Sequence, residues 1–173
     1  MASSLSYKAG IEGEKAVVQA LQELDDSHCL INDIMAGRGR GNIDHVLLSP
    51  TGIFAIETKN YTGDVRCDGN RWRKKGKRRL YDIPSVSRQA INNADYLGSL
   101  IKRKLNLDIP VCPVCVFTNP WVELKLRKPT IPVLRLSELV DFVREIPPLT
   151  TLTDSEIQAV SRCILGKHSD SPG

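Results

Sequence analysis

Residues 42–61 read NIDHVLLSPTGIFAIETKNY and consist of two largely apolar runs on either side of a short break. Residues 42–49 and 52–61 are rich in the branched and aromatic side chains that are typical of strands. Pro50 at the second position of the break and Gly52 at the fourth fit a type I turn. The stretch therefore predicts a β-hairpin, from which the other elements can be placed.

The register of this hairpin decides where its polar side chains meet. With a two-residue loop, Ser49 faces Gly52, and Asp44 then lies opposite Glu57 with the Cβ atoms about 5 Å apart. Lys59 shares a strand face with Glu57 because side chains alternate along a strand. We therefore expect two carboxylates and an ammonium at one end of the hairpin. A bulge at Gly52 would instead shift the register by one residue and turn Asp44 to the other face.

Opposed carboxylates repel each other unless a cation lies between them. Hard divalent ions such as Mg²⁺ take oxygen ligands from one or two carboxylates, a backbone carbonyl and waters. Lys59 is close enough in sequence to orient or deprotonate a metal-bound water, or to stabilise negative charge in a transition state. The alternative is an ordinary solvated strand end with an Asp and a Glu–Lys pair.

A third acidic side chain stands out on the first predicted helix, residues 8–24. Glu14 precedes Val17, Val18 and Leu21 by three, four and seven residues, which places its carboxylate on the apolar face. Burying an unpaired charge costs several kcal/mol, so we expect a partner or a shifted pKa. The alternative is a first-turn glutamate favoured by the helix dipole.

Apolar periodicity and turn residues outline the other elements. We expect strands over 30–35, 111–117 and 131–136, helices over 85–105, 137–145 and 153–165, and a less regular stretch over 63–82 with a hairpin turn at 68–70. Ser85 is the expected cap of the second helix, and Thr153 with Glu156 has the form of a capping box. This order of elements predicts an α/β fold around a mixed central sheet.

Composition excludes several classes of protein. The chain has 173 residues, of which 41% are hydrophobic and 25% charged, as in ordinary globular proteins with one domain. No apolar stretch approaches the roughly 18 residues of a membrane span, and the first residues lack the pattern of a secretory signal. The five cysteines are an odd number, typical of reduced thiols, so we expect a cytoplasmic protein.

Cys112 and Cys115 form a C-x-x-C pair, which is also found in redox sites and zinc sites. No second pair follows, and both residues lie in the apolar run 109–117. We therefore interpret them as buried strand cysteines, since free cysteine behaves as a small hydrophobe.

Positive charge is concentrated in one segment. Between Arg66 and Arg79 there are eight basic residues and one acid, although the net charge of the whole chain is only +4. Such a cationic segment on a nearly neutral body is typical of a polyanion site, and the alternative is a mobile solvated loop. Trp72 and Tyr81 flank the run and could stack on bases, although Trp72 could equally be a core residue.

Two further polar residues need an interpretation. Gln89 lies near the start of the second predicted helix and could reach a phosphate or an attacking water, or could simply be a surface residue. His45 neighbours Asp44 but points to the opposite strand face, so we interpret it as structural.

Taken together, these motifs resemble the nuclease-related domain of the PD-(D/E)XK nuclease superfamily. The motifs are Gly13-Glu14 on the first helix, residues 41–45 entering a strand, residues 57–61 on the next strand and Gln89 on the second helix. The resemblance covers about residues 8–120 and extends to archaeal Holliday-junction resolvases. It implies a restriction-endonuclease-like core, a mixed central sheet of four to five strands flanked by helices. We expect a single domain over 1–165, with a C-terminal strand and helices over 121–165 and a disordered tail over 166–173.

The resemblance also implies roles for individual residues. Asp44 and Glu57 would be ligands of Mg²⁺ or Mn²⁺, with the Thr58 carbonyl as a third and Glu14 as a further ligand, direct or through water. Lys59 would be the catalytic lysine and Gln89 the glutamine of the family. The superfamily's proline before the aspartate is absent, because Ile43 stands there.

The sequence thus predicts a metal-dependent nuclease that hydrolyses phosphodiester bonds in nucleic acid, DNA rather than RNA. The residues expected to bind the nucleic acid are Arg71, Arg73, Lys74, Lys75, Lys77, Arg78 and Arg79. The alternative is a nucleic-acid-binding module on a nuclease scaffold with little or no turnover. We expect no membrane partner. Because the resolvase-like relatives often form dimers, a homodimer is one of the oligomeric states that the resemblance allows.

Overall fold

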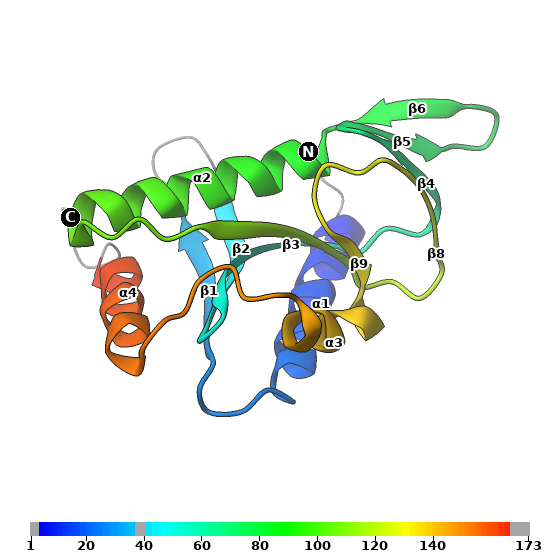
Figure 1. Ribbon diagram of the computed structural model, residues 1–173. Coiled ribbons are helices and arrows are strands. Elements are labelled where there is room, and N and C mark those ends of the chain that lie inside the picture. Colours follow the sequence, from blue (N-terminus) through cyan, green and yellow to red (C-terminus); the bar gives the residue numbers. More distant parts are fainter. Residues whose placement is uncertain (1–3, 37–40, 167–173) are drawn as a thin grey trace.

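The fold is built on a mixed five-stranded sheet, sheet A (Figure 1). The structure is a computed structural model that describes residues 4–36 and 41–166. In spatial order the strands of sheet A are β1 (Cys29–Met35), β2 (Asn42–Ser49), β3 (Gly52–Lys59), β7 (Val111–Phe117) and β9 (Val133–Arg135). The first three strands pair antiparallel, whereas β3, β7 and β9 pair parallel. The predicted α/β fold with a mixed central sheet is confirmed.

Helices cover both faces of sheet A. They are α1 (Ser4–Leu21), α2 (Val86–Leu105), α3 (Leu139–Glu145), which follows the 3-10 turn η1 (Leu136–Glu138), and α4 (Asp154–Gly166). One buried cluster joins sheet A to α2 and α4, and another joins it to α1 and α3. Figure 1 shows α2 running across one face, with α4 beside its carboxyl-terminal end.

The central hairpin adopts the predicted register. Ser49 pairs with Gly52 and the ladder continues without a bulge to the pair His45–Ile56. Neighbouring residues of β3 then alternate between the two buried clusters, because Ala55 packs with α2 and α4 while Ile56 packs with α1 and α3. β3 is therefore buried on both faces, and its end is where polar side chains emerge.

The stretch expected to be less regular forms most of a second sheet, sheet B, so that expectation was wrong. Its strands are β6 (Leu80–Ile83), β5 (Arg71–Lys75), β4 (Gly63–Asp68) and β8 (Val122–Arg127), in spatial order. Charged residues obscure the alternation, because Val65, Cys67 and Trp72 are the only buried apolar side chains of β4 and β5. The predicted turn is confirmed, since β4 and β5 are joined by Gly69, with φ of +58°, and Asn70.

Trp72 fastens sheet B to the rest of the protein. Its ring stacks on Phe117 of β7 at 5.7 Å between centroids, and its Nε1 donates to Ser87 Oγ at 2.8 Å. The side chain is 1% exposed, so it cannot stack on a base, and the core interpretation is the correct one. Tyr81, at 46% exposure, remains open to such a contact.

Several local expectations are confirmed. Ser85 caps α2 by accepting from the backbone of Arg88, and Thr153 and Glu156 form the capping box of α4. All five cysteines are free. Of the pair expected to be buried on a strand, Cys115 is buried on β7, whereas Cys112, at the start of the same strand, is only partly buried. Among the described residues no helix combines the length and apolar character that a membrane span requires. Residues 167–173 of the predicted tail lie outside the described residues.

The packing of α1 on sheet A requires glycine at position 13. A Cβ there would lie 2.8 Å from Thr118 Oγ1 and 3.2 Å from Asn60 Cβ. We predict that Gly13→Ala lowers the free energy of unfolding by about 1–3 kcal/mol, because the overpacking outweighs the better helix propensity of alanine. Gly10→Ala is the control: nothing lies within 4 Å of a Cβ there, so it should stabilise α1. Denaturant unfolding midpoints that rank the two variants in the opposite order would contradict this packing.

Sheet B is also held together by a charge cluster. Arg66 donates to both oxygens of Asp64 at 2.8 Å and Lys125 of β8 donates to Asp64 at 2.6 Å, which together hold the pKa of Asp64 well below its ordinary 3.8. The ionised form therefore stabilises the fold above that ordinary pKa, and the contribution is lost as the pH falls through the lowered one.

We predict that Asp64→Asn lowers the melting temperature at pH 7 and that the difference from the parent narrows as the pH falls from the ordinary pKa of Asp64 toward about pH 2. Asp82→Asn is the control, because Asp82 and its partner Arg71 are 62% and 65% exposed and such surface pairs contribute little. An equal effect of Asp64→Asn at both pH values would show that its charge is not what stabilises sheet B.

Candidate active site at the end of the β2–β3 hairpin

All five residues predicted to be catalytic line one cavity, of about 790 Å³. They come from four different elements: Glu14 from α1, Asp44 from β2, Glu57 and Lys59 from β3, and Gln89 from α2. The packing at Gly13 is what brings the next residue of α1 to this cavity. The structure thus brings together residues that are up to 75 positions apart in the sequence.

Glu57 is the most deeply buried polar group of the cavity, with 1% of its side chain exposed. Its Oε1 accepts from Lys59 Nζ at 2.5 Å, and its Oε2 accepts from Asn93 Nδ2 at 3.4 Å. Burial raises the pKa of Glu57 to about 7, the negative charge of Asp44 adds to this rise, and Lys59 opposes it. At this pKa, about half of the Glu57 side chains would be protonated near neutral pH. The neighbouring groups therefore do not fully stabilise the ionised carboxylate, and a further positive charge would.

Asn93 is a residue that the sequence analysis missed. It lies on α2, is 5% exposed and is flanked on the buried face by Ala90 and Leu97. An asparagine at a core position of an amphipathic helix is the signal that could have identified it, because a buried amide needs a partner.

Asp44 interrupts the ladder between β2 and β3. The last regular pair before it is His45–Ile56, and beyond this the Oδ2 of Asp44 accepts from the backbone N of Thr58 at 2.7 Å. Its side chain takes the place of a strand-to-strand hydrogen bond, so the expected direct opposition to Glu57 becomes a contact with the next residue. Burial raises the pKa of Asp44 despite this hydrogen bond.

Lys59 connects the carboxylates to α2. Besides its contact with Glu57, its Nζ donates to Gln89 Oε1 at 3.3 Å. Burial disfavours the ammonium, but the adjacent Glu57 outweighs this and the pKa of Lys59 is raised. Of the roles considered for Lys59, orienting a water and stabilising negative charge suit a protonated amine, whereas removing a proton does not.

Glu14 lies at the rim of the cavity and is exposed, so the expected buried position on the apolar face was wrong. Partial desolvation and the neighbouring Asp44 and Asp33 still raise its pKa. Within residues 4–36 and 41–166, no three His, Cys, Asp or Glu side chains form a group that could hold a metal ion. The role of Glu14 as a further ligand, direct or through water, stays a prediction.

The donor set nevertheless fits a hard divalent cation. The Oδ2 of Asp44 is used by Thr58, and its Oδ1 has no hydrogen-bond partner in the described part of the chain. Glu57 contributes a second carboxylate whose raised pKa shows that one lysine does not fully compensate it. Because all these donors are oxygens, Mg²⁺ or Mn²⁺ suits them better than a softer metal.

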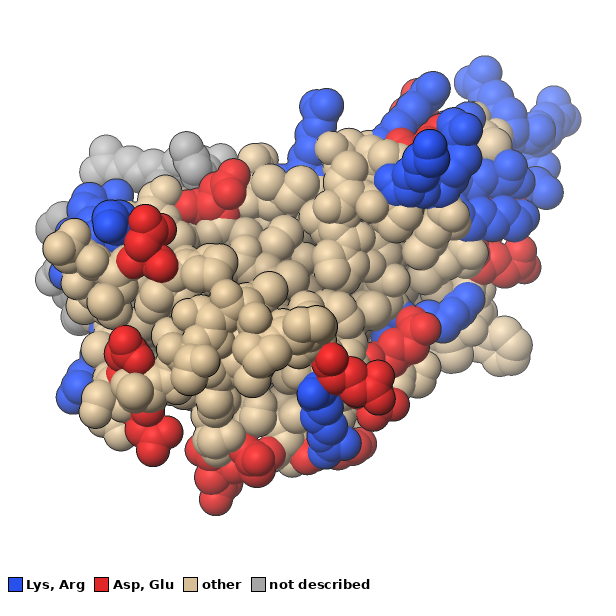
Figure 2. Space-filling view, in the orientation of Figure 1, with Lys and Arg blue, Asp and Glu red and all other residues tan. Residues whose placement is uncertain are grey.

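The basic segment adjoins this cavity through β5. Lys74 lines the cavity and its Nζ lies 5.1 Å from the ring centroid of Tyr61, another lining residue. Figure 2 shows Lys and Arg side chains gathered over the end of sheet B formed by β5 and β6. Arg71 is paired with Asp82. The members without an ion pair among the described residues are Arg73, Lys74, Lys75, Lys77, Arg78 and Arg79.

His45 faces away from the carboxylates, as expected. Its Nδ1 lies 2.7 Å from Asn32 Oδ1 and burial lowers its pKa to about 4, so the ring is neutral at physiological pH. It lines a separate cavity with residues of α1.

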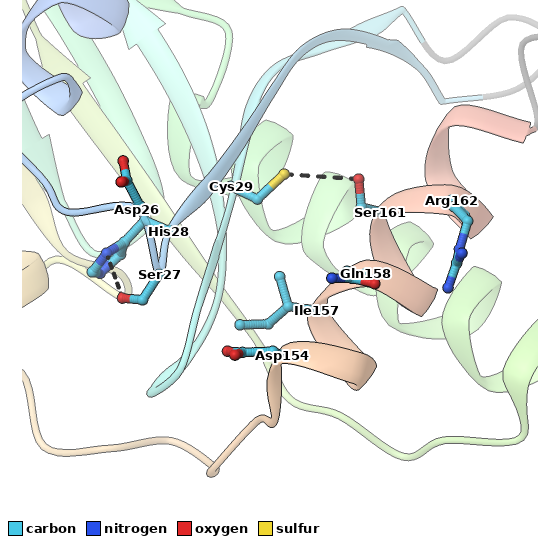
Figure 3. Close-up of a pocket in the computed structure, with 9 residues that line it drawn as sticks. All are labelled: Asp26, Ser27, His28, Cys29, Asp154, Ile157, Gln158, Ser161 and Arg162. Carbon is cyan, nitrogen blue, oxygen red and sulfur yellow. Dashed lines mark hydrogen bonds between the residues drawn. The ribbon is translucent and has the colours of Figure 1, made fainter.

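Another cavity, of about 600 Å³, lies between the start of β1 and α4 (Figure 3). It contains none of the predicted site residues. Its Ser27 and the nearby Asp25 both contact the same nitrogen of His28, at 3.2 and 2.9 Å, so the three residues cannot form a proton relay. The predicted catalytic residues instead line the cavity of about 790 Å³ that contains Asp44 and Glu57, called the carboxylate cavity below.

Comparison with known proteins identifies the family of the chain. The family described as the nuclease-related domain matches residues 9–118, which include all five cavity residues. An uncharacterized protein of Bacillus anthracis is 38% identical over 58 residues, which cover 31% of this chain and 27% of that relative. No solved structure matches the chain. Because the match spans well over half of its length, the chain belongs to the nuclease-related domain family, in keeping with a place in the PD-(D/E)XK superfamily.

Proposed function

We propose that this protein is a metal-dependent nuclease that hydrolyses phosphodiester bonds in DNA. Membership of the nuclease-related family implies a nucleic-acid substrate in general terms. The observation that carries the proposal further is the cavity itself, where two carboxylates from paired strands, a lysine and a glutamine converge.

The carboxylates are the proposed metal ligands. Asp44 offers its Oδ1, and Glu57 offers an oxygen once Lys59 shifts toward Gln89, to which it already donates. The Thr58 carbonyl is the proposed third ligand. A divalent ion bound there neutralises charge on the scissile phosphate and lowers the pKa of a bound water.

The other polar residues position the reacting groups. Lys59, kept protonated by its surroundings, donates hydrogen bonds to the attacking water or to the oxygen that gains negative charge. Gln89 Oε1 holds the lysine in that place. Glu14 at the rim orients a water that reaches the metal ligands from solvent.

The unpaired basic residues of β5 and the β5–β6 connection supply affinity for the backbone of the substrate. Contacts to phosphates depend strongly on salt and carry no sequence preference. Lys74 connects this surface to the cavity, so a strand bound along β5 passes the carboxylates.

One observation favours the alternative, a binding module without turnover. Lys59 lies 2.5 Å from Glu57, and the described carboxylates do not form a group of three. Cleavage measurements with defined variants separate the two functions.

We predict that the parent cleaves DNA with Mg²⁺ or Mn²⁺ and that Asp44→Asn and Lys59→Met each lower the rate by at least about 100-fold. Asp26→Asn, which removes an exposed acid outside the cavity, is the control and should cleave like the parent. Calorimetric titration with Mn²⁺ gives an independent readout, because only Asp44→Asn should weaken metal binding strongly. Equal cleavage by parent and variants would refute the proposed site, and binding without cleavage in any metal would favour the alternative.

We further predict that the triple variant Lys77→Ala, Arg78→Ala, Arg79→Ala binds DNA more weakly and with a flatter dependence on salt. For every phosphate that the variant no longer neutralises, the slope of log K against log salt should fall by about 0.7–0.9.

The matched control for this prediction is Lys102→Ala, Arg103→Ala, Lys104→Ala. It removes the same charge from exposed positions that lie about 20 Å along α2 from Gln89. Equal reductions of affinity in the two triple variants would mean that overall charge, rather than this surface, attracts DNA.

A further inference from the structure

Trp121 is exposed to an unusual degree for a large aromatic side chain. It lies in the turn between β7 and β8 with 79% of its surface accessible, whereas the other tryptophan, Trp72, is 1% exposed. A tryptophan can bury 150–250 Å² and contributes strongly to packing or binding when it does so. Within the protein, the side chain of Trp121 buries only a small part of that area.

The turn that carries Trp121 is held rigidly. The backbone N of Trp121 donates to Asn119 Oδ1 at 3.0 Å, and the backbone N of Val122 donates to Asn119 O at 3.2 Å. The carbonyl of Trp121 accepts from Gly63 N at 3.1 Å, which fixes the turn to the start of β4. A ring presented on a preordered backbone can bind a flat partner with little loss of conformational entropy.

The same turn is attached to the carboxylate cavity. Asn119 Nδ2 donates to Oδ1 of Asn60, a lining residue, at 2.9 Å, and Asn60 in turn donates to the carbonyl of Ala9 on α1 at 2.6 Å. Gly63, which holds the Trp121 carbonyl, directly follows Thr62, the last lining residue of that segment. The turn that carries the exposed ring is therefore linked by hydrogen bonds to residues that line the proposed site or directly follow them.

We infer that Trp121 is a stacking platform for an unpaired base of the substrate, so that the protein selects nucleic acid with unpaired nucleotides beside the cavity. The inference rests on the proposed function and narrows its substrate class. Stacking on an aromatic side chain requires a free base face, which single strands and frayed ends offer and an intact duplex does not. It tolerates any base, in keeping with the phosphate contacts expected of the basic surface.

The test uses the natural fluorescence of the full chain without divalent metal, so that no substrate is consumed. We expect oligo(dT) to quench the tryptophan emission, since Trp121 is the exposed tryptophan, and a duplex of the same length to leave it nearly unchanged. Trp121→Phe should abolish the quenching of tryptophan emission, because the buried Trp72 is then the tryptophan that remains.

Affinity provides the second readout. Trp121→Ala should weaken oligo(dT) binding, measured by anisotropy, by about 5- to 150-fold, the range measured for loss of one stacked base. Its affinity for the duplex should stay within about twofold of the parent. Leu165→Ala, which removes another exposed apolar side chain, on α4, is the control and should bind like the parent.

The outcomes separate this inference from the proposed function. Cleavage by the parent with unchanged emission and full affinity of Trp121→Ala would overturn the stacking role and leave the nuclease intact. Equal quenching by duplex and single strand would overturn the preference for unpaired bases. Failure to bind any nucleic acid would overturn both.

Discussion

The buried carboxylate of Glu57 is the constraint around which the site is arranged. β3 is buried on both faces by helices, so a glutamate near its end leaves water and needs compensating groups. Lys59 and Asn93 supply part of that compensation, yet the nearby Asp44 opposes it and the pKa of Glu57 stays high. A buried carboxylate whose charge is not fully compensated destabilises the fold unless a bound cation interacts with it. We therefore attribute the arrangement to the binding of a cation rather than to the stability of the fold.

The hydrogen bond from Thr58 N to Asp44 explains how the cavity opens. A regular ladder between β2 and β3 would place backbone carbonyls where the carboxylate now lies, and both acids would project from one face of the sheet. Because Asp44 takes over one ladder position through its side chain, its other oxygen is left free at the end of the hairpin. Asp44, the residue that interrupts the pairing of β2 and β3, is thus also the residue whose free oxygen is the proposed metal ligand.

How far the sequence could predict this structure depended on whether the deciding contacts were local. The two-residue loop set the register of the central hairpin, and from it the convergence of Asp44, Glu57 and Lys59 could be foreseen. Sheet B could not be foreseen in the same way, because charged side chains obscure the alternation in β5 and because β4 pairs with β8, far away in the sequence. The depth of Trp72 and the partner of Asn93 are set by long-range packing, which periodicity alone does not show. Glu14 was placed at the right cavity but at the wrong depth, because helical spacing gives a direction and not the distance to the neighbouring sheet.

The parallel pairing of β3 and β7 explains why the proposed catalytic and nucleic-acid-binding residues meet. Parallel strands end at the same edge of a sheet, and the backbone N of Thr118 after β7 donates to the carbonyl of Lys59 at 3.0 Å. Segments that follow two such strands form a crevice at their carboxyl ends, the usual position of ligands in α/β sheets. The connection from β3 to β7 must cross over the sheet, and this connection contains the basic strand β5 as well as α2 with Gln89 and Asn93. The chain therefore leaves the carboxylates, forms the cationic surface and returns along α2 to the same edge. The topology of sheet A is what places this positively charged crossover beside the proposed metal-binding acids.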